Sequence, residues 1–154
     1  MELEDLRSRM SPDAQQYAER TLDMYNAPFA RVLGIEIESI DLDRVVCSLT
    51  VRPEQMNSMG RAHGATIYGL IDHTFAIASN LVRDCTGSST NCIFYRPGSG
   101  KLTAVAVPIN RSRSMEMYDI RVTNEEGKLV ASSTCTAFAI KRDRDGRQVL
   151  PILR

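Results

Sequence analysis

The sequence predicts an α+β domain in which a strongly curled antiparallel sheet surrounds one long apolar helix. Residues 61–80, RAHGATIYGLIDHTFAIASN, carry apolar side chains at helical spacing on nearly all sides. Strand-like runs precede and follow this helix, and short turn signals separate them. A helix that is apolar nearly all round must be covered on most sides, which a curled sheet can do.

The composition predicts one globular domain without a general attraction to charged partners. At 154 residues, the chain has the usual size of a single domain, with helices expected in residues 1–33 and the sheet and long helix in residues 34–154. Lys plus Arg and Asp plus Glu number 19 each, so net charge favours neither nucleic acid nor a membrane surface.

The cysteines and the N-terminal sequence predict a soluble cytoplasmic protein. The four cysteines form no CxxC pair and indicate reduced thiols rather than a disulfide or zinc framework. The start, MELEDLRSRM, has alternating charges and no apolar segment, so we expect no signal peptide. No run reaches the roughly 18 apolar residues that a membrane-spanning helix needs.

Two helices are expected before the sheet begins. Ser11 and Pro12 are typical of an N-cap and a first helical position, so a helix is expected to start there and run to about residue 25. A short second helix is expected over residues 26–33, with Gly34 as its C-cap.

The expected strands alternate apolar and polar residues or are rich in β-branched residues. A C-terminal edge strand is expected in residues 143–153, after a turn at Asp145–Gly146. The other expected strands are IEIESIDL (35–42) and RVVCSLTV (44–51) before the long helix, and STNCIFY (89–95), KLTAVAVPIN (101–110), SMEMYDIRVTN (114–124) and KLVASSTCTAFAIKR (128–142) after it.

Asp72 is a carboxylate in the middle of the long helix, where we expect it to be desolvated. It lies off the apolar stripe that faces the core, which comprises Ile67, Leu70, Ile71, Thr74, Phe75 and Ala78. Its own face carries only small residues, namely Ala65, Gly69, Ala76 and Ser79. Two interpretations stay open: a second helix packs closely along this face, or a narrow ligand groove runs along it.

His63–Gly64 marks the start of the same helix. Backbone N–H groups in the first turn lack internal partners and lie at the positive end of the helix dipole, so they can bind an oxyanion. Asn57 in the preceding loop offers an amide for the same oxygen or for a water molecule. A lone histidine such as His63 is more often a hydrogen-bonding residue that orders a loop than a catalyst.

Gly64 and Asp72 are too far apart to act on one carbon from a single chain. Eight residues correspond to about 12 Å along a helix axis. Two antiparallel copies of the helix, related by a twofold axis, can place Gly64 of one chain beside Asp72 of the other. If these residues form an active site, it therefore lies between subunits.

The pattern N-x-x-G-x-x-H-G…D, here Asn57, Gly60, His63, Gly64 and Asp72, resembles the hotdog-fold acyl-CoA thioesterases of the phenylacetate-degradation (PaaI-like) type. The similarity extends over about residues 30–140. The resemblance implies a helix wrapped by a curved sheet, a homodimer that often pairs into a homotetramer, an acyl-CoA substrate and no cofactor.

The resemblance also implies a role for each matching residue. The Gly64 N–H and Asn57 would polarise the thioester carbonyl, and Asp72 of the partner chain would activate water or attack directly. His63 would order the loop. The family often adds a hydroxyl that holds the water, for which the candidates here are Ser88, Ser89 and Thr90.

Further residues are expected to contact the substrate. Ala65 replaces the second glycine of the family's usual His-Gly-Gly and is expected to narrow the approach to the helix, beside Gly69. Arg111 and Arg113 lie on a turn that resembles a basic turn in relatives, so they are expected to bind the coenzyme A phosphates. Arg96 and Lys101 are weaker candidates.

The alternatives to a thioesterase differ in what they need from the site. No metal is expected, because His63 and His73 are ten residues apart rather than four. A hotdog domain that binds acyl-CoA or an acyl chain without hydrolysing it needs no desolvated carboxylate, so Asp72 favours an enzyme. A hotdog dehydratase needs a longer loop motif that the sequence lacks.

Overall fold

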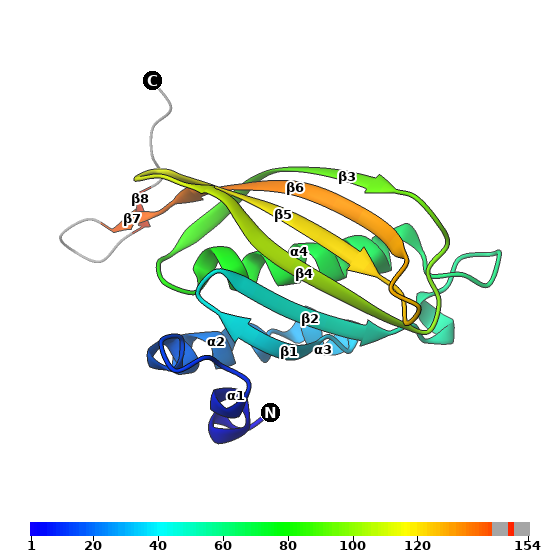
Figure 1. The fold of residues 1–154 in the computed structure, drawn as a ribbon, viewed down its shortest axis with the longest axis horizontal. Helices are drawn as coiled ribbons and strands as arrows, with labels where there is room; N and C mark the ends of the chain where they lie inside the picture. The colour runs from blue at the N-terminus through cyan, green and yellow to red at the C-terminus, as the bar shows by residue number, and fades with distance from the viewer. Residues whose placement is uncertain (143–147, 150–154) are drawn as a thin grey trace.

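The computed structural model describes residues 1–142 and 148–149, and a curved antiparallel sheet encloses helix α4 (Gly64–Asn80) in it (Figure 1). The strand order in this six-stranded sheet is β1-β2-β4-β5-β6-β3. This confirms the expected α+β arrangement. The strands are β1 (Glu36–Asp41), β2 (Arg44–Thr50), β3 (Cys85–Phe94), β4 (Lys101–Arg111), β5 (Met115–Thr123) and β6 (Leu129–Ala139).

The apolar stripe of α4 is buried against the sheet, as its spacing predicted. The ring of Phe75 packs edge-to-face on Tyr118 of β5, with ring centroids 5.8 Å apart. The Tyr118 hydroxyl donates to the carbonyl oxygen of Ala78 at 3.1 Å. These contacts fix the rotation of α4, and they leave Ala65, Tyr68 and Asp72 exposed on its outer side.

The N-terminal segment differs from the expectation of one helix starting at Pro12. The Ser11 N–H donates to the Ile40 carbonyl oxygen at 2.8 Å, and the Ser11 hydroxyl donates to Asp41 at 3.2 Å. Ser11 therefore fastens the chain to the end of β1 and does not cap a helix. The helices are α1 (Leu3–Ser8), which was not expected, η1 (Gln15–Tyr17), α2 (Ala18–Tyr25) and α3 (Pro28–Leu33).

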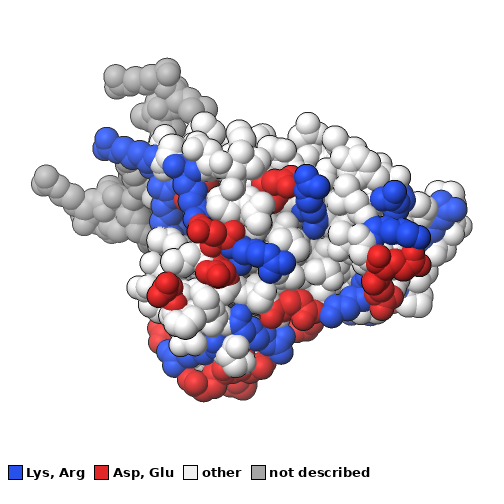
Figure 2. Space-filling view, viewed as in Figure 1, with Lys and Arg blue, Asp and Glu red and all other residues white. Residues whose placement is uncertain are grey.

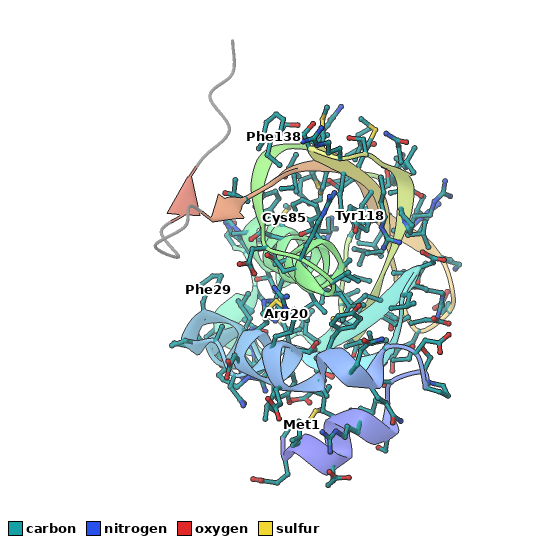
Figure 3. All side chains as sticks on the ribbon, turned by 90° about the vertical axis from the view of Figure 1, so that its left-hand side faces the viewer. Met1, Arg20, Phe29, Cys85, Tyr118 and Phe138 are labelled. Carbon is teal, nitrogen blue, oxygen red and sulfur yellow. The ribbon has the colours of Figure 1, made fainter. Side chains whose placement is uncertain are left out.

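Helices α2 and α3 cover part of the side of α4 that faces away from the sheet, as Figure 3 shows in an end-on view. The C-cap expected for α3 is confirmed, because Gly34 has a φ of 72°. Leu33 at the end of α3 packs so closely on Gly69 that a Cβ there would lie 2.6 Å from Leu33 Cδ1.

The two edges of the sheet differ in how they are covered. At β1, Met10 forms a parallel bridge with Ile40, so the N-terminal segment protects that edge. At the other edge, β3 is ten residues long, and most of its residues are exposed. It begins at Cys85, before the expected start at residue 89. An unpaired edge of this length is a template for pairing with another strand.

The expected C-terminal strand is present as β8 (Gln148–Val149), which pairs with β7 (Lys141–Arg142) in a separate two-stranded sheet. The turn expected at Asp145–Gly146 lies outside the described residues. On the face in Figure 2, acidic and basic side chains are interspersed. None of the helices in the described residues combines the length and apolar character that a membrane crossing requires.

Candidate functional site

A cavity of about 340 Å³ lies where α4 begins, between the loop that precedes the helix and the end of β3. Asn57 and Gly64, both expected in the site, line it. We call it the Asn57–Gly64 cavity. Its walls also include Met59 from the loop and Phe94 and Tyr95 from the end of β3, all of which are exposed.

The loop before α4 fixes the orientation of the Asn57 side chain. Its carboxamide oxygen accepts the N–H groups of Met59, at 2.9 Å, and Arg61, at 3.3 Å. Gly60 completes the turn with a φ of 70°, a region that glycine enters at little cost. Because the oxygen is occupied by the loop, the amide NH₂ of Asn57 is left to donate, and it has no partner among the described residues.

His63 acts as the N-cap of α4. Its Nδ1 accepts the Ala65 N–H at 3.0 Å, and its backbone N–H donates to Gln55 at 2.9 Å. These two hydrogen bonds tie the loop to the first turn of α4. The neighbouring Gly64 N–H has no acceptor within the described part of the chain. A Cβ at Gly64 would lie 3.7 Å from the Phe94 ring, an ordinary contact, so packing within the single chain does not require a glycine at this position.

Asp72 lies outside this cavity. In the single chain its residue is exposed, contrary to the expected burial, yet desolvation by its neighbours raises the pKa of its carboxyl above the ordinary value. The eight residues between Gly64 and Asp72 separate them by about 12 Å along α4. One chain therefore does not bring the two groups to a common centre.

The three hydroxyl candidates on β3 do not share one hydrogen-bond partner on β6. Ser88 and Ser89 both hydrogen-bond to the Thr136 hydroxyl, at 2.8 and 2.5 Å. Thr90 instead hydrogen-bonds to the thiol of Cys135, a fully buried residue. Burial raises the pKa of this thiol, and the Asp72 carboxylate adds a smaller contribution in the same direction. A β-bulge between Gly87 and Ser89 produces this division, because it shifts the register of β3 against β6.

The small residues expected along a substrate groove have different surroundings. Ala65 is exposed and lines a neighbouring cavity of about 320 Å³ with Phe29 and Val32 of α3. Gly69 is buried beneath Leu33. At Gly69 the close packing of a second helix therefore explains the small residue, and α3 occupies the place expected for the groove.

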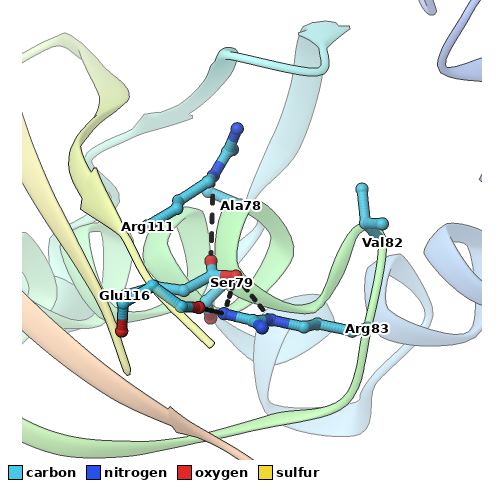
Figure 4. A pocket seen from close by; sticks show the side chains of 7 residues that line it. Ala78, Ser79, Val82, Arg83, Arg111 and Glu116 are labelled. Atoms are coloured by element: carbon cyan, nitrogen blue, oxygen red, sulfur yellow. Dashed lines mark hydrogen bonds and ion pairs between the residues drawn. The ribbon is translucent and has the colours of Figure 1, made fainter. Parts of the chain in front are cut away.

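Arg111 lies at the opposite end of α4, in a cavity of about 280 Å³ that Figure 4 shows from close by. Its guanidinium donates to Asp43 at 2.6 Å and to the Leu42 carbonyl oxygen at 2.7 Å. The buried Glu116 lies 3.9 Å from it and 2.7 Å from Arg83. Arg111 thus links β4 to the turn between β1 and β2 and to β5.

The other basic candidates are dispersed. Arg113 is exposed on the turn after β4, at the same end of α4 as Arg111. Lys101 pairs with Glu38 at 2.7 Å. Arg96 lines the Asn57–Gly64 cavity, and its guanidinium also donates to the Leu129 carbonyl oxygen. Among these basic residues, Arg96 alone is found at the Asn57–Gly64 cavity.

The aromatic wall of the cavity was not predicted. Phe94 and Tyr95 end a strand directly before the turn RPGSG, and they are exposed although aromatic residues favour burial. From the sequence alone, an aromatic pair at a strand end could lie against many other segments. In the structure, the end of β3 lies beside the start of α4, so the pair lines the same cavity as Gly64. Among the described residues, no group of three or more metal-ligating side chains comes together.

Known proteins share sequence similarity with this chain. Residues 59–131 match the family model of the thioesterase superfamily. The acyl-coenzyme A thioesterase PaaI of Escherichia coli (strain K12) is 34% identical over 109 residues, which cover 69% of this chain and 78% of that protein. This chain belongs to the thioesterase superfamily.

Solved structures agree with this membership. The Escherichia coli PaaI protein from the phenylacetic acid degradation operon superposes with a TM-score of 0.78 at 29% identity, over 88% of this chain and 96% of that one. A protein of Thermus thermophilus gives a TM-score of 0.71 at 36% identity, over 74% of this chain and 98% of that one. A 1,4-dihydroxy-2-naphthoyl-CoA hydrolase of Listeria monocytogenes is 30% identical over 117 residues, 73% of this chain and 94% of that protein. The expected hotdog fold and thioester hydrolase class are confirmed.

Proposed function

We propose that the protein is a cytoplasmic acyl-CoA thioesterase whose active site is shared between two chains. The reaction adds water across the thioester, so that the acyl carbon gains a hydroxyl, the carbon–sulfur bond breaks and the thiol leaves with a proton. The observation that carries the proposal is the pair of donors without partners, the Gly64 N–H and the Asn57 amide, in one cavity of the described structure.

The two donors form the half of the site that polarises the carbonyl. Negative charge develops on the thioester oxygen as the carbonyl carbon becomes tetrahedral. An N–H at the start of a helix and a fixed amide stabilise such an oxyanion without reorganising during the reaction. His63 contributes indirectly, because its hydrogen bond to Ala65 fixes the first turn of α4.

Asp72 of the partner chain forms the half of the site that supplies the nucleophile. As a general base, it takes a proton from the attacking water; as a nucleophile, it forms an acyl-enzyme anhydride that water then opens. Thr90 of the same chain as Asp72 is the hydroxyl that holds the water. A raised carboxyl pKa makes Asp72 a stronger base than an ordinary aspartate.

The surface around α4 supports a twofold dimer. Arg61, Ala65, Tyr68 and Asp72 are exposed along one side of the helix and its start, and we call them the exposed strip. Strand β3 contacts α4 and leaves its outer edge unpaired within the described sheet. Pairing β3 with β3 of a second chain would bring the exposed strips together in opposite directions. A homotetramer would then join two such dimers.

The acyl-CoA binder without turnover remains the second candidate, because the single chain forms the donor cavity without a carboxylate in it. The shared-site enzyme and the binder are distinguished by an exchange experiment. Inactive Asn57→Ala chains are mixed with inactive Asp72→Asn chains, and the subunits are allowed to exchange. In a mixed dimer one site carries both substitutions and the other carries neither. Random pairing makes about half the dimers mixed, so roughly a quarter of all sites should be intact.

The measurement is thiol release from acyl-CoA by each variant alone and by the exchanged mixture. Recovery of about a quarter of the wild-type rate supports the shared site. Mixtures that stay inactive after exchange has been verified by mass spectrometry contradict it. Acyl-CoA that stabilises the wild type against heat and is recovered intact after hours identifies the binder.

A further inference from the structure

Tyr68 lies midway between Gly64 and Asp72 on α4. It is four residues from each, so it is about 6 Å from both along the axis and about 40° from both around it. Its side chain is 40% exposed, whereas the adjacent Ile67 is buried. A large ring on the exposed strip is therefore left outside the core of the single chain.

The proposed function, on which this inference rests, fixes what Tyr68 faces. If Gly64 of one chain lies beside Asp72 of the other, the two α4 helices run antiparallel and residue n faces residue 136 − n, because 64 and 72 add to 136. Tyr68 then faces its own copy at the twofold axis. The two active sites lie on either side of this ring pair, about 12 Å apart along the helices.

The direction of the side chain assigns each ring to one site. Side chains on a helix lean toward its N-terminus and cover the preceding turn. By this tendency, the Tyr68 ring would lean toward Gly64 and Ala65 of its own chain. Phe94 lies on another side of Gly64, 3.7 Å from where a Cβ would be. In the proposed dimer, a carbonyl oxygen on the Gly64 N–H would then have the Phe94 ring on one side and the Tyr68 ring on another.

We infer that Tyr68 determines which acyl groups the enzyme accepts. Its ring closes the acyl side of the site toward the twofold axis, so an acyl chain cannot extend along the seam between the two helices. The substrates are therefore acyl-CoA molecules with short or compact acyl groups. Tyr68 limits the size of the acyl group and takes no part in the hydrolysis itself, which we assign to Asp72, the Gly64 N–H and the Asn57 amide.

The test compares kcat/KM for acetyl-, butyryl-, octanoyl- and palmitoyl-CoA. Tyr68→Ala should raise the ratio of octanoyl to acetyl hydrolysis by about tenfold or more, since single methylenes in a pocket discriminate by that order. Tyr68→Phe keeps the ring and should keep the wild-type ratio, whereas Tyr68→Trp should lower it. Ile109→Ala, which removes another exposed apolar side chain on β4, should change nothing.

An unchanged ratio in both Tyr68→Ala and Tyr68→Trp, in proteins that remain dimeric and active, overturns the inference. This outcome differs from failure of the proposed function, in which Asp72→Asn would keep its activity whatever Tyr68 does. Because Tyr68→Ala reduces the side chain and Tyr68→Trp enlarges it, one of them still tests the inference when the other does not assemble into a dimer.

Mixed dimers test the assignment of the ring to its own Gly64. The intact site of a mixed dimer takes Gly64 from the Asp72→Asn chain. Tyr68→Ala added to that chain should broaden the acyl range of the surviving site, and Tyr68→Ala added to the Asn57→Ala chain should leave it near wild type. A larger or equal effect from the Asn57→Ala chain overturns the assignment.

Discussion

Gly64 and Asp72 lie eight residues apart on α4, about 12 Å along its axis, with Tyr68 midway between them. The helix is continuous within one chain, so folding alone never closes this distance. In the antiparallel pair that we propose, each Gly64 would lie beside the other chain's Asp72. Each chain would then contribute one half of each of two sites.

Asp72→Asn tests the carboxylate directly. The substitution keeps the shape and removes the base, so turnover should fall by about 10²–10⁴-fold, the usual contribution of general base catalysis. Asp23→Asn on the outer side of α2 is the matched control and should keep wild-type turnover. Steady-state thiol release measures both. An Asp72→Asn enzyme within a few-fold of wild type would show that another group activates the water.

Thr90→Val should lower turnover by about tenfold, because the attacking water loses an acceptor or donor that orients it. Ser88→Ala is the control: its hydroxyl bonds to Thr136 and not to Cys135, so the rate should not change. The comparison uses kcat at saturating acyl-CoA. An equal loss of kcat in Thr90→Val and Ser88→Ala would show that Thr90 has no special role in holding the water.

His73 should make stability depend on pH. Burial lowers its pKa from 6.5 to about 4, with a smaller contribution from Arg31, and its Nε2 is buried without a hydrogen-bond partner in the described structure. The unfolded chain binds a proton below about 6.5 and the folded chain does not until about 4. The free energy of unfolding should therefore fall as pH drops through this window, by at most ~3 kcal/mol.

Denaturant unfolding at pH 7 and pH 5, at one protein concentration, measures the effect of His73. His73→Leu removes the titrating group, so its stability should fall less between the two pH values than that of the wild type. Identical pH dependence in the two proteins would rule out the histidine as the cause.

Gly69→Ala should destabilise the protein by about 1 kcal/mol. The new methyl group collides with Leu33, which costs about 1–3 kcal/mol as overpacking, and the better helix propensity of alanine returns about 1. In a Leu33→Ala background the collision is absent, so the same substitution should become stabilising. A double-mutant cycle by denaturant unfolding measures this reversal. The same sign in both backgrounds would contradict the close packing of α3 on Gly69.

Local patterns determined most of the fold. The apolar spacing of α4 and the alternation in β1 required particular faces to be buried, and Gly34 ended α3 because only a residue that tolerates positive φ fits there. The start of the first helix was predicted wrongly. Ser11 has the chemistry of a cap, but its groups bond to β1, a strand about thirty residues later, and no local pattern contains that contact.

The sequence by itself predicted which residues carry the chemistry, because Asn57, Gly64 and Asp72 have the types and spacing that an oxyanion and an attacking water require, and His63 can order the loop between them. The tertiary structure decided what surrounds them. The end of β3 placed Phe94 close to Gly64, the bulge in β3 left Thr90 opposite Cys135 while Ser88 bonds to Thr136, and Leu33 of α3 packed on Gly69. Such contacts join segments far apart in the chain, and their geometry depends on the packing of the whole domain rather than on the spacing of neighbours.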